Sequence, residues 1–186
     1  MNVYFTSDTH YHHTNIIKYC ERPFADIPSM HEGLVSAWNS TVADDDIVFH
    51  LGDYALPKHS QLDELRDMTL ALKGLKFLIR GNHDKLSNDF LLSAGFKSIH
   101  DSISLGGVLL THHPLHEALP RDSSILKLGS FDHVIHGHIH RRDVPNFDTH
   151  YNVAVDRNEF KPVPLETAVP QHLRDSFLQD LKRTII

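Results

Sequence analysis

Short apolar segments that end in clusters of polar residues recur along the chain. Five of them have the length and the β-branched or aromatic content of buried strands: 2–10, 45–53, 75–84, 108–114 and 131–140. The run "SISL" precedes the fourth segment, and Gly106 and Gly107 lie between the two. A glycine pair between two strand-like runs predicts a tight hairpin.

Helical segments separate the predicted strands, over 33–40, 61–73 and 171–186. Ser29 and Glu32 have the spacing of a capping box ahead of the first helix. Ser60 opens the second helix, and Gly74 ends it. The third helix presents four apolar residues on one face: Leu173, Phe177, Leu178 and Leu181. Strands that alternate with helices and then form a hairpin predict an α/β domain with a mixed sheet.

Composition narrows the class of protein. The 186 residues suit one domain over 1–186, and 40% apolar with 23% charged residues is ordinary for globular proteins. We expect no membrane association, because no apolar run approaches ~18 residues and the N-terminus lacks a signal-peptide pattern. The single cysteine, Cys20, indicates a reducing compartment and therefore a cytoplasmic protein. A formal net charge of −6 argues against binding of long duplex DNA.

Histidine is the outlier in this composition. The chain has 17 histidines against 18 lysines and arginines together, which suggests a metal site. The stretch "HGHIH" at 136–140 alone leaves two interpretations open. Its three imidazoles are either metal ligands or polar side chains on the solvent-facing side of a strand.

Polar residues follow each predicted strand at its carboxyl end. Two carboxylates, one amide and four imidazoles are the candidate ligands: Asp8, Asp53, Asn82, His10, His112, His138 and His140. Ligand sites of open α/β sheets lie beyond the carboxyl ends of the strands, so we expect these side chains to converge. Imidazole and carboxylate together suit Mn, Fe, Zn or Ni, and seven ligands suit two ions with open positions. The alternative is a polar sheet edge that faces solvent.

The same residues form five motifs along the chain: "DTH" (8–10), "GD" (52–53), "GNHD" (81–84), "HHP" (112–114) and "GHIH" (137–140). Their order and spacing resemble the calcineurin-like metallophosphoesterase superfamily. The flanking segments "DTHYHHTNII", "CERPF" and "YNVAVD" are similar to a small bacterial and phage single-domain subgroup. The resemblance implies an α/β fold of two packed mixed β-sheets flanked by α-helices, in four αββα layers.

Roles for single residues follow from this resemblance. It implies one metal ion held by Asp8, His10 and His140, and a second held by Asn82, His112 and His138. Asp53 would bridge the two ions, and His83 would face the leaving oxygen without binding metal. The nucleophile in such a centre is a metal-bound hydroxide. His113 stands where the family varies, and His136 is expected to be structural.

Other residues near the motifs are candidates for contact with substrate. Those expected to bind its phosphate are Asn15, Arg22, Arg141 and Arg142. The guanidinium fork of arginine matches phosphate oxygens. His13 and Asp84 are expected to support the metal ligands from behind, although His13 shares the loop of Asn15 and could equally contact substrate.

The second motif continues as "GDYALPKHS", without the orienting Asp and the Arg-Gly pair of protein serine/threonine phosphatases. The partner that orients His83 is therefore left open.

We expect a phosphodiesterase with two divalent cations, manganese first and Fe, Zn, Ni or Co as alternatives. Its substrate would be a small phosphoester of a nucleotide or an RNA end, for example a cyclic phosphate. A broad-specificity phosphomonoesterase is the alternative, a non-catalytic scaffold a remote one, and the oligomeric state is left open.

Overall fold

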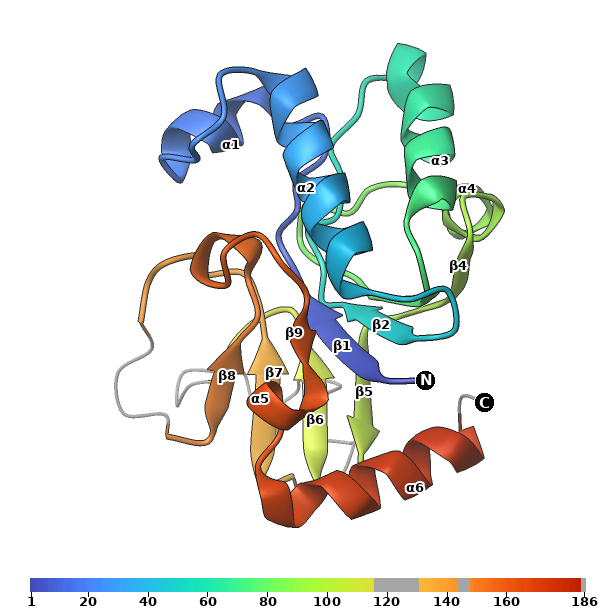
Figure 1. The fold of residues 1–186 in the computed structure, drawn as a ribbon, viewed down its shortest axis with the longest axis vertical. Helices are drawn as coiled ribbons and strands as arrows, with labels where there is room; N and C mark the ends of the chain where they lie inside the picture. The colour runs from blue at the N-terminus through green and yellow to red at the C-terminus, as the bar shows by residue number, and fades with distance from the viewer. Residues whose placement is uncertain (116–130, 144–147, 185–186) are drawn as a thin grey trace.

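Two β-sheets pack face to face in this computed structural model, which describes residues 1–115, 131–143 and 148–184 (Figure 1). The first sheet has the strand order β4 (Phe96–His100), β3 (Leu75–Ile79), β2 (Ile47–His50), β1 (Val3–Thr6) and β9 (Val163–Pro164). The second has the order β5 (Ser102–Leu105), β6 (Val108–Thr111), β7 (His133–His136) and β8 (His150–Asn152). Strands β1 to β4 are parallel, as are β6 to β8, whereas β9 and β5 are antiparallel edge strands.

Alternation along β1 explains how the first sheet is covered on both faces. Val3 and Phe5 point into the apolar cluster between the two sheets, whereas Tyr4 packs on the opposite side. The ring of Phe5 stacks on Phe49 at 5.8 Å and meets the edge of Phe177 at 5.9 Å. Such aromatic pairs add about 0.5–1.5 kcal/mol beyond area burial. Apolar side chains on both faces are typical of a parallel sheet buried between two layers.

Helices cover the outer face of the first sheet. They are α1 (Thr14–Tyr19), α2 (Ile27–Thr41), α3 (Leu62–Ala71) and α4 (Asn88–Ser93). Their apolar residues, including Leu34, Trp38 and Leu65, form a second cluster with Val48 and Leu78 of the sheet. The expected two mixed sheets with flanking helices are therefore confirmed. No helix among the described residues has the length and apolarity needed to cross a membrane.

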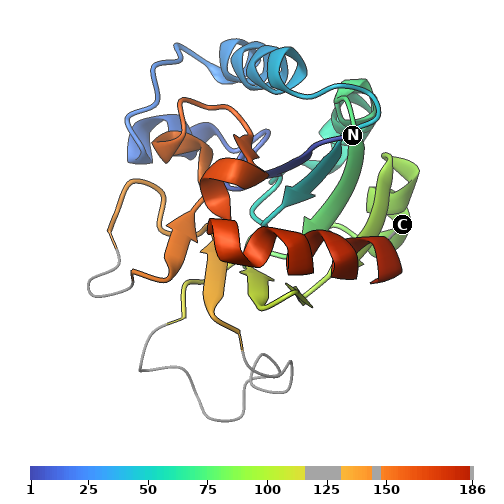
Figure 2. The same cartoon turned by 60° about the horizontal axis from the view of Figure 1, so that its bottom comes forward.

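The C-terminal segment contains two further α-helices, α5 (Leu165–Ala168) and α6 (Arg174–Thr184), and the short 3₁₀ turns η3 (Val155–Arg157) and η4 (Gln171–Leu173). Figure 2 shows α6, in red, crossing the front of the molecule. It places Phe177 and Leu181 in the cluster between the sheets and touches β5. The predicted C-terminal helix is thus confirmed, and its last two residues, 185 and 186, lie outside the described part.

Helix starts differ from those predicted. The capping box of α2 joins Asp26 and Ser29, not Ser29 and Glu32, because the Asp26 carboxylate accepts the N–H of Ser29 at 2.9 Å. The helix therefore begins at Ile27, well before residue 33. Ser60 does not cap α3 either, because it lies inside a 3₁₀ turn, η1 (His59–Gln61). The hairpin at 106–107 is confirmed as the β5–β6 turn.

The parallel arrangement brings the candidate ligands together. Motif residues follow β1, β2, β3, β6 and β7 directly, and these strands run parallel within their sheets. Their carboxyl ends meet where the edges of the two sheets adjoin. The N–H of Gly137, after β7, donates to His112 O after β6 at 3.0 Å. His138 N, in the second sheet, donates to the Asp8 carboxylate of the first at 3.0 Å.

Candidate metal centre

Hydrogen bonds between strand-end loops hold the site together. Asp8 N donates to Gly52 O at 2.9 Å, and His10 N donates to Asp53 O at 3.0 Å. The loop after β1 is therefore tied along its length to the loop after β2. Because His138 N also donates to Asp8, the loop after β7 is bound to the same point. Three loops from two sheets thus share one rigid framework.

Two motif glycines allow these loops to approach each other. A Cβ on Gly81 would collide with the backbone nitrogen and carboxylate of Asp53. A Cβ on Gly137 would collide with Ser7 and with the carboxylate of Asp8. Both colliding partners belong to the candidate ligand loops, so glycine at these positions permits close backbone approach.

Five candidate ligands have left-handed backbone conformations. Their φ angles are +58° at Asp8, +52° at His10, +53° at Asp53, +70° at His138 and +51° at His140. Non-glycine residues adopt this region rarely, and it costs on the order of 1–3 kcal/mol each. Five of the nine non-glycine residues with positive φ in the described part of the chain are thus candidate ligands, and such strain clusters at functional sites.

Asp8, His10 and His140 form one group of potential ligands, with donor atoms all within 4.8 Å of one another. The Nε2 atoms of His10 and His140 lie 4.0 and 3.8 Å from Asp8 Oδ1. His10 Nε2 is buried and has no hydrogen-bond partner among the described residues. An unpartnered buried nitrogen costs free energy, which a cation bound at this group would recover.

A second group lies on the other side of the site and contains His112, His113 and His138. His112 Nδ1 donates to Leu51 O at 2.8 Å, so a neutral His112 presents a lone pair at Nε2. That lone pair lies 3.1 Å from Asn82 Oδ1. Two acceptors facing each other require a proton or a cation between them. The donor set therefore fits a metal ion.

Asp53 lies between the two groups. Its Oδ2 is 3.5 Å from His10 Nε2 and 3.4 Å from His112 Nε2. Burial raises the pKa of Asp53, but its hydrogen bonds to His112 and to the backbone N–H of His83 outweigh burial and lower it. The carboxylate is consequently ionised and faces both ligand groups.

Burial sets the protonation of the neighbouring histidines. It lowers the pKa of His10 to about 2 and that of His138 to about 4. Both imidazoles are therefore neutral near pH 7, which is the form that binds metal ions. Burial also opposes protonation of His112, but the Asp53 carboxylate reverses the effect and raises its pKa.

His140 is oriented by a residue that the sequence did not single out. Its Nδ1 donates to Asp156 Oδ2 at 2.6 Å, which directs Nε2 toward Asp8. Burial lowers the pKa of His140, but the bond to Asp156 and the nearby Cys20 and Asp8 raise it to about 10. A carboxylate behind a histidine ligand fixes the tautomer and the ring orientation. The signal in the sequence was the final aspartate of "YNVAVD".

Arg22 lies behind the ligand loop, where only 4% of it is exposed. Its Nε and Nη2 donate to both oxygens of Asp156 at 2.8 and 2.9 Å. Nη2 also donates to Asp8 O at 2.6 Å, and Nη1 donates to Thr9 O at 2.9 Å. The structure therefore does not bring Arg22 to a surface where substrate phosphate could reach it.

These features agree with comparisons to known proteins. The calcineurin-like phosphoesterase superfamily domain matches residues 1–155. The chain belongs to this superfamily. An uncharacterized protein of Methanocaldococcus jannaschii is 36% identical over 176 residues, which cover 90% of this chain and 89% of its own. A solved structure from Aquifex aeolicus, of a protein of unknown function, has a TM-score of 0.70 at 26% identity and covers 89% of this chain and 96% of its own.

Asp84 supports the second motif. This buried carboxylate accepts the N–H groups of Gly81 at 2.8 Å, Asp53 at 2.9 Å and Tyr54 at 2.8 Å. Three backbone bonds to one carboxylate fix the loop after β2 against the loop after β3. Asp84 thus binds the backbone of the candidate ligand Asp53 through these hydrogen bonds.

A cleft of about 620 Å³ is lined in part by candidate ligands. Its lining contains five candidate catalytic or metal residues and four predicted substrate or supporting residues: His10, Asp53, His83, His138, His140, His13, Asn15, Arg141 and Arg142. Arg141 and Arg142 are exposed on it. The remaining lining residues are Ile16, Tyr19, Cys20, Glu21 and Ile139.

His83 and His13 stand side by side in the cleft. The His83 side chain is 46% exposed, and its Nε2 is 4.0 Å from Asp53 Oδ2. His13 Nδ1 is 3.2 Å from His10 Nδ1, so one of the two nitrogens donates to the other. The rings of His13 and His83 are 6.0 Å apart. His113, which the motif comparison set aside, lies 4.3 Å from the ring of His138 and joins the second ligand group.

Proposed function

We propose that this phosphoesterase hydrolyses phosphodiesters with the help of two divalent cations. The observation that carries the proposal is the floor of the cleft, where two ligand groups meet at Asp53. Asp8, His10 and His140 would hold one ion, and Asn82, His112 and His138 the other, with Asp53 between them. When bound, such ions supply Lewis acidity toward the phosphoryl oxygens and an activated water. Manganese suits this mixture of imidazole and carboxylate ligands.

His83 is suited to act on the leaving group. It belongs to neither ligand group, yet it lines the cleft next to Asp53. Its backbone N–H donates to Asp53 Oδ1 at 2.9 Å, which fixes the position of the residue without involving the ring. The imidazole is therefore free to donate a proton or a hydrogen bond to a departing oxygen.

The lining of the cleft favours a diester over a monoester. It contains two exposed arginines, Arg141 and Arg142, and one exposed aromatic ring, Tyr19. A phosphodiester carries two substituents and a single negative charge, so it matches an open cleft lined by both cationic and aromatic side chains. Nucleotides and RNA ends, including cyclic phosphates, have this chemistry.

Paired assays test the proposal. After removal of metal by a chelator, addition of Mn²⁺ should restore hydrolysis of bis-p-nitrophenyl phosphate, and elemental analysis should find about two ions per chain. The value of kcat/KM should be higher for this diester than for p-nitrophenyl phosphate. Asp53→Ala should abolish activity, whereas Asp101→Ala, on an exposed turn outside the cleft, should not.

Two results would contradict the proposal. One is activity that survives the chelator with at most one tightly bound ion, which would exclude the two-ion centre. The other is a higher kcat/KM for the monoester, which would assign the chain to the broad-specificity phosphomonoesterases.

A further inference from the structure

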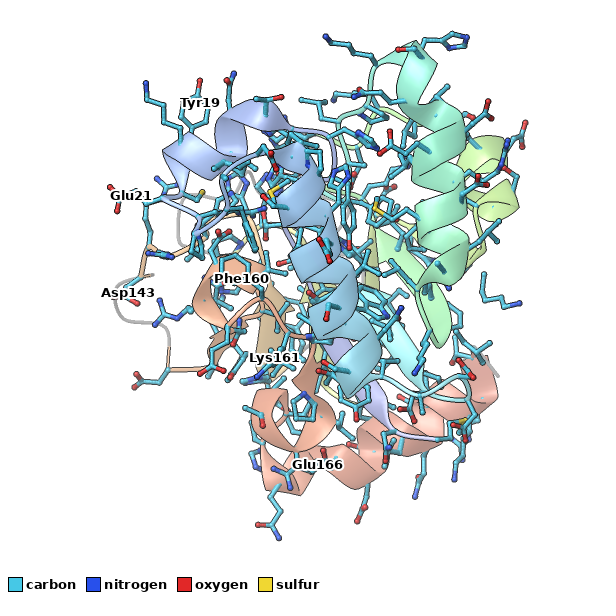
Figure 3. All side chains as sticks on the ribbon, turned by 45° about the horizontal axis from the view of Figure 1, so that its top comes forward. Tyr19, Glu21, Asp143, Phe160, Lys161 and Glu166 are labelled. Atoms are coloured by element: carbon cyan, nitrogen blue, oxygen red, sulfur yellow. The ribbon has the colours of Figure 1, made fainter. Side chains whose placement is uncertain are left out.

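Tyr19 has an unusual position for a large side chain. It is the last residue of α1, it is 71% exposed, and it lines the cleft. Figure 3 shows Tyr19 and Glu21 projecting at the same corner of the molecule. Single exposed apolar residues are normal on protein surfaces and need no explanation. An exposed aromatic ring that lines the candidate site is different, because it is placed to contact whatever binds there.

A row of rings leads from Tyr19 to the floor of the cleft. Tyr19 meets His13 at 6.5 Å in an edge-to-face arrangement. His13 lies 5.1 Å from His10 and 6.0 Å from His83. Since His13 approaches Tyr19 edge to face, at 79° between the planes, the two rings do not stack on each other. His13 therefore contacts both Tyr19 and the candidate metal ligand His10.

Two kinds of side chain at the cleft suit different parts of a substrate. Arg141 and Arg142 offer guanidinium groups, which match phosphate oxygens. The exposed ring of Tyr19 offers a flat π-surface, on which flat, uncharged groups stack.

We infer that Tyr19 stacks on the base of a nucleoside esterified to the scissile phosphate. The inference rests on the proposed phosphodiesterase function and names its substrate class, nucleoside phosphodiesters. A base offers a flat, uncharged π-surface, and stacking on an exposed tyrosine accepts any of the four bases. The phosphate then lies over the ligand groups, and Arg141 and Arg142 bind its charged oxygens.

Two diesters with the same leaving group test the inference: thymidine 5′-p-nitrophenyl phosphate and methyl p-nitrophenyl phosphate. They differ only in the nucleoside, so the ratio of their kcat/KM values isolates its contribution. In Tyr19→Ala this ratio should fall by about 5- to 150-fold, the range expected for one stacked base. Tyr19→Phe should keep the ratio near that of the wild type, because phenylalanine retains the π-face. Leu70→Ala, 56% exposed on α3 and outside the cleft, should not change it.

Binding gives a second readout that does not depend on catalysis. Thymidine 5′-monophosphate should inhibit more strongly than inorganic phosphate, and Tyr19→Ala should remove most of the difference. If Tyr19→Ala lowers kcat/KM for both diesters by the same factor, their ratio does not change. The stacking role is then refuted while the diesterase function stands. If the wild type hydrolyses neither diester with Mn²⁺ present, the proposed function and this inference both fail.

Discussion

Arg22 offers the sharpest test of how the site is built. Its motif position predicted a phosphate contact, whereas in the structure its guanidinium donates to Asp156 and to the carbonyls of Asp8 and Thr9. The Arg22–Asp156 ion pair is fully buried on both sides. Replacement by methionine, which has a similar length, removes the charge and leaves Asp156 buried with His140 as its remaining side-chain partner.

The structure gives the size of the expected effect. Breaking a buried ion pair by removing one partner costs about 3–5 kcal/mol. In a chain of this size that loss lowers Tm by roughly 6–20 °C. Metal content should fall as well, because the Asp8–Thr9 backbone and the orientation of His140 both depend on the same guanidinium. A phosphate clamp would behave differently, because its loss raises KM and leaves folding almost unchanged.

Thermal unfolding of the chelated protein, elemental analysis and KM for bis-p-nitrophenyl phosphate separate these outcomes. Arg142→Met is the matched control, since Arg142 is exposed in the cleft: its KM should rise and its Tm should stay within about 2 °C. Arg22→Lys keeps a charge but not the planar fork, so an intermediate loss of stability is expected. If Arg22→Met leaves Tm and metal content at wild-type levels and raises only KM, the structural role deduced for Arg22 is refuted.

Three further predictions follow from the site and its surroundings. His83→Ala should retain its metal but slow hydrolysis by on the order of 10²–10⁴ for a poor leaving group and by less for p-nitrophenolate; equal losses on both substrates, or loss of metal, would contradict its assigned role. Gly137→Ala should lower metal content, because the new Cβ collides with Asp8; unchanged binding in elemental analysis would argue against this close approach. Burial lowers the pKa of His50 to about 3 in the folded protein. As pH falls below about 6.5, His50 is therefore protonated in the unfolded chain while it stays neutral in the folded one. Urea unfolding in the presence of a chelator should therefore show a free energy of unfolding that falls between pH 6.5 and 4. In His50→Gln the free energy should fall less steeply with pH. An unchanged slope would refute the contribution of this histidine.

The sequence predicted the strands better than the helix starts, for a physical reason. Buried strands such as β1, β2 and β3 are short and apolar on both faces, so composition alone marks them. Helix α2 begins at Ile27, capped by Asp26, because an aspartate and a serine can also form a reciprocal capping box, a pairing that the Ser–Glu pattern does not include. Strand β9 has only two residues, Val163 and Pro164, and no periodic pattern is detectable over that length.

The candidate ligands were predicted because each one directly follows a strand, and strand ends converge by topology. Residues that act on them from a distance in sequence were harder to find. Asp156 reaches His140 from the 3₁₀ turn after β8, and Arg22 reaches Asp156 across 134 positions. No local pattern encodes a bond of that separation, so these contacts require the structure. The segments "CERPF" and "YNVAVD" contain Arg22 and Asp156, but the sequence suggested only a phosphate contact for Arg22 and no role for Asp156.

The strained backbone of the ligands explains why such distant support exists. Each left-handed ligand residue costs on the order of 1–3 kcal/mol, against a net stability of about 5–15 kcal/mol for a typical domain. The loops can hold these conformations only if other contacts over-determine them. Arg22 fixes the carbonyls of Asp8 and Thr9, and Asp84 fixes three N–H groups around Asp53. These contacts come from side chains of the protein itself, so they offset part of the strain in the loops that carry the candidate ligands.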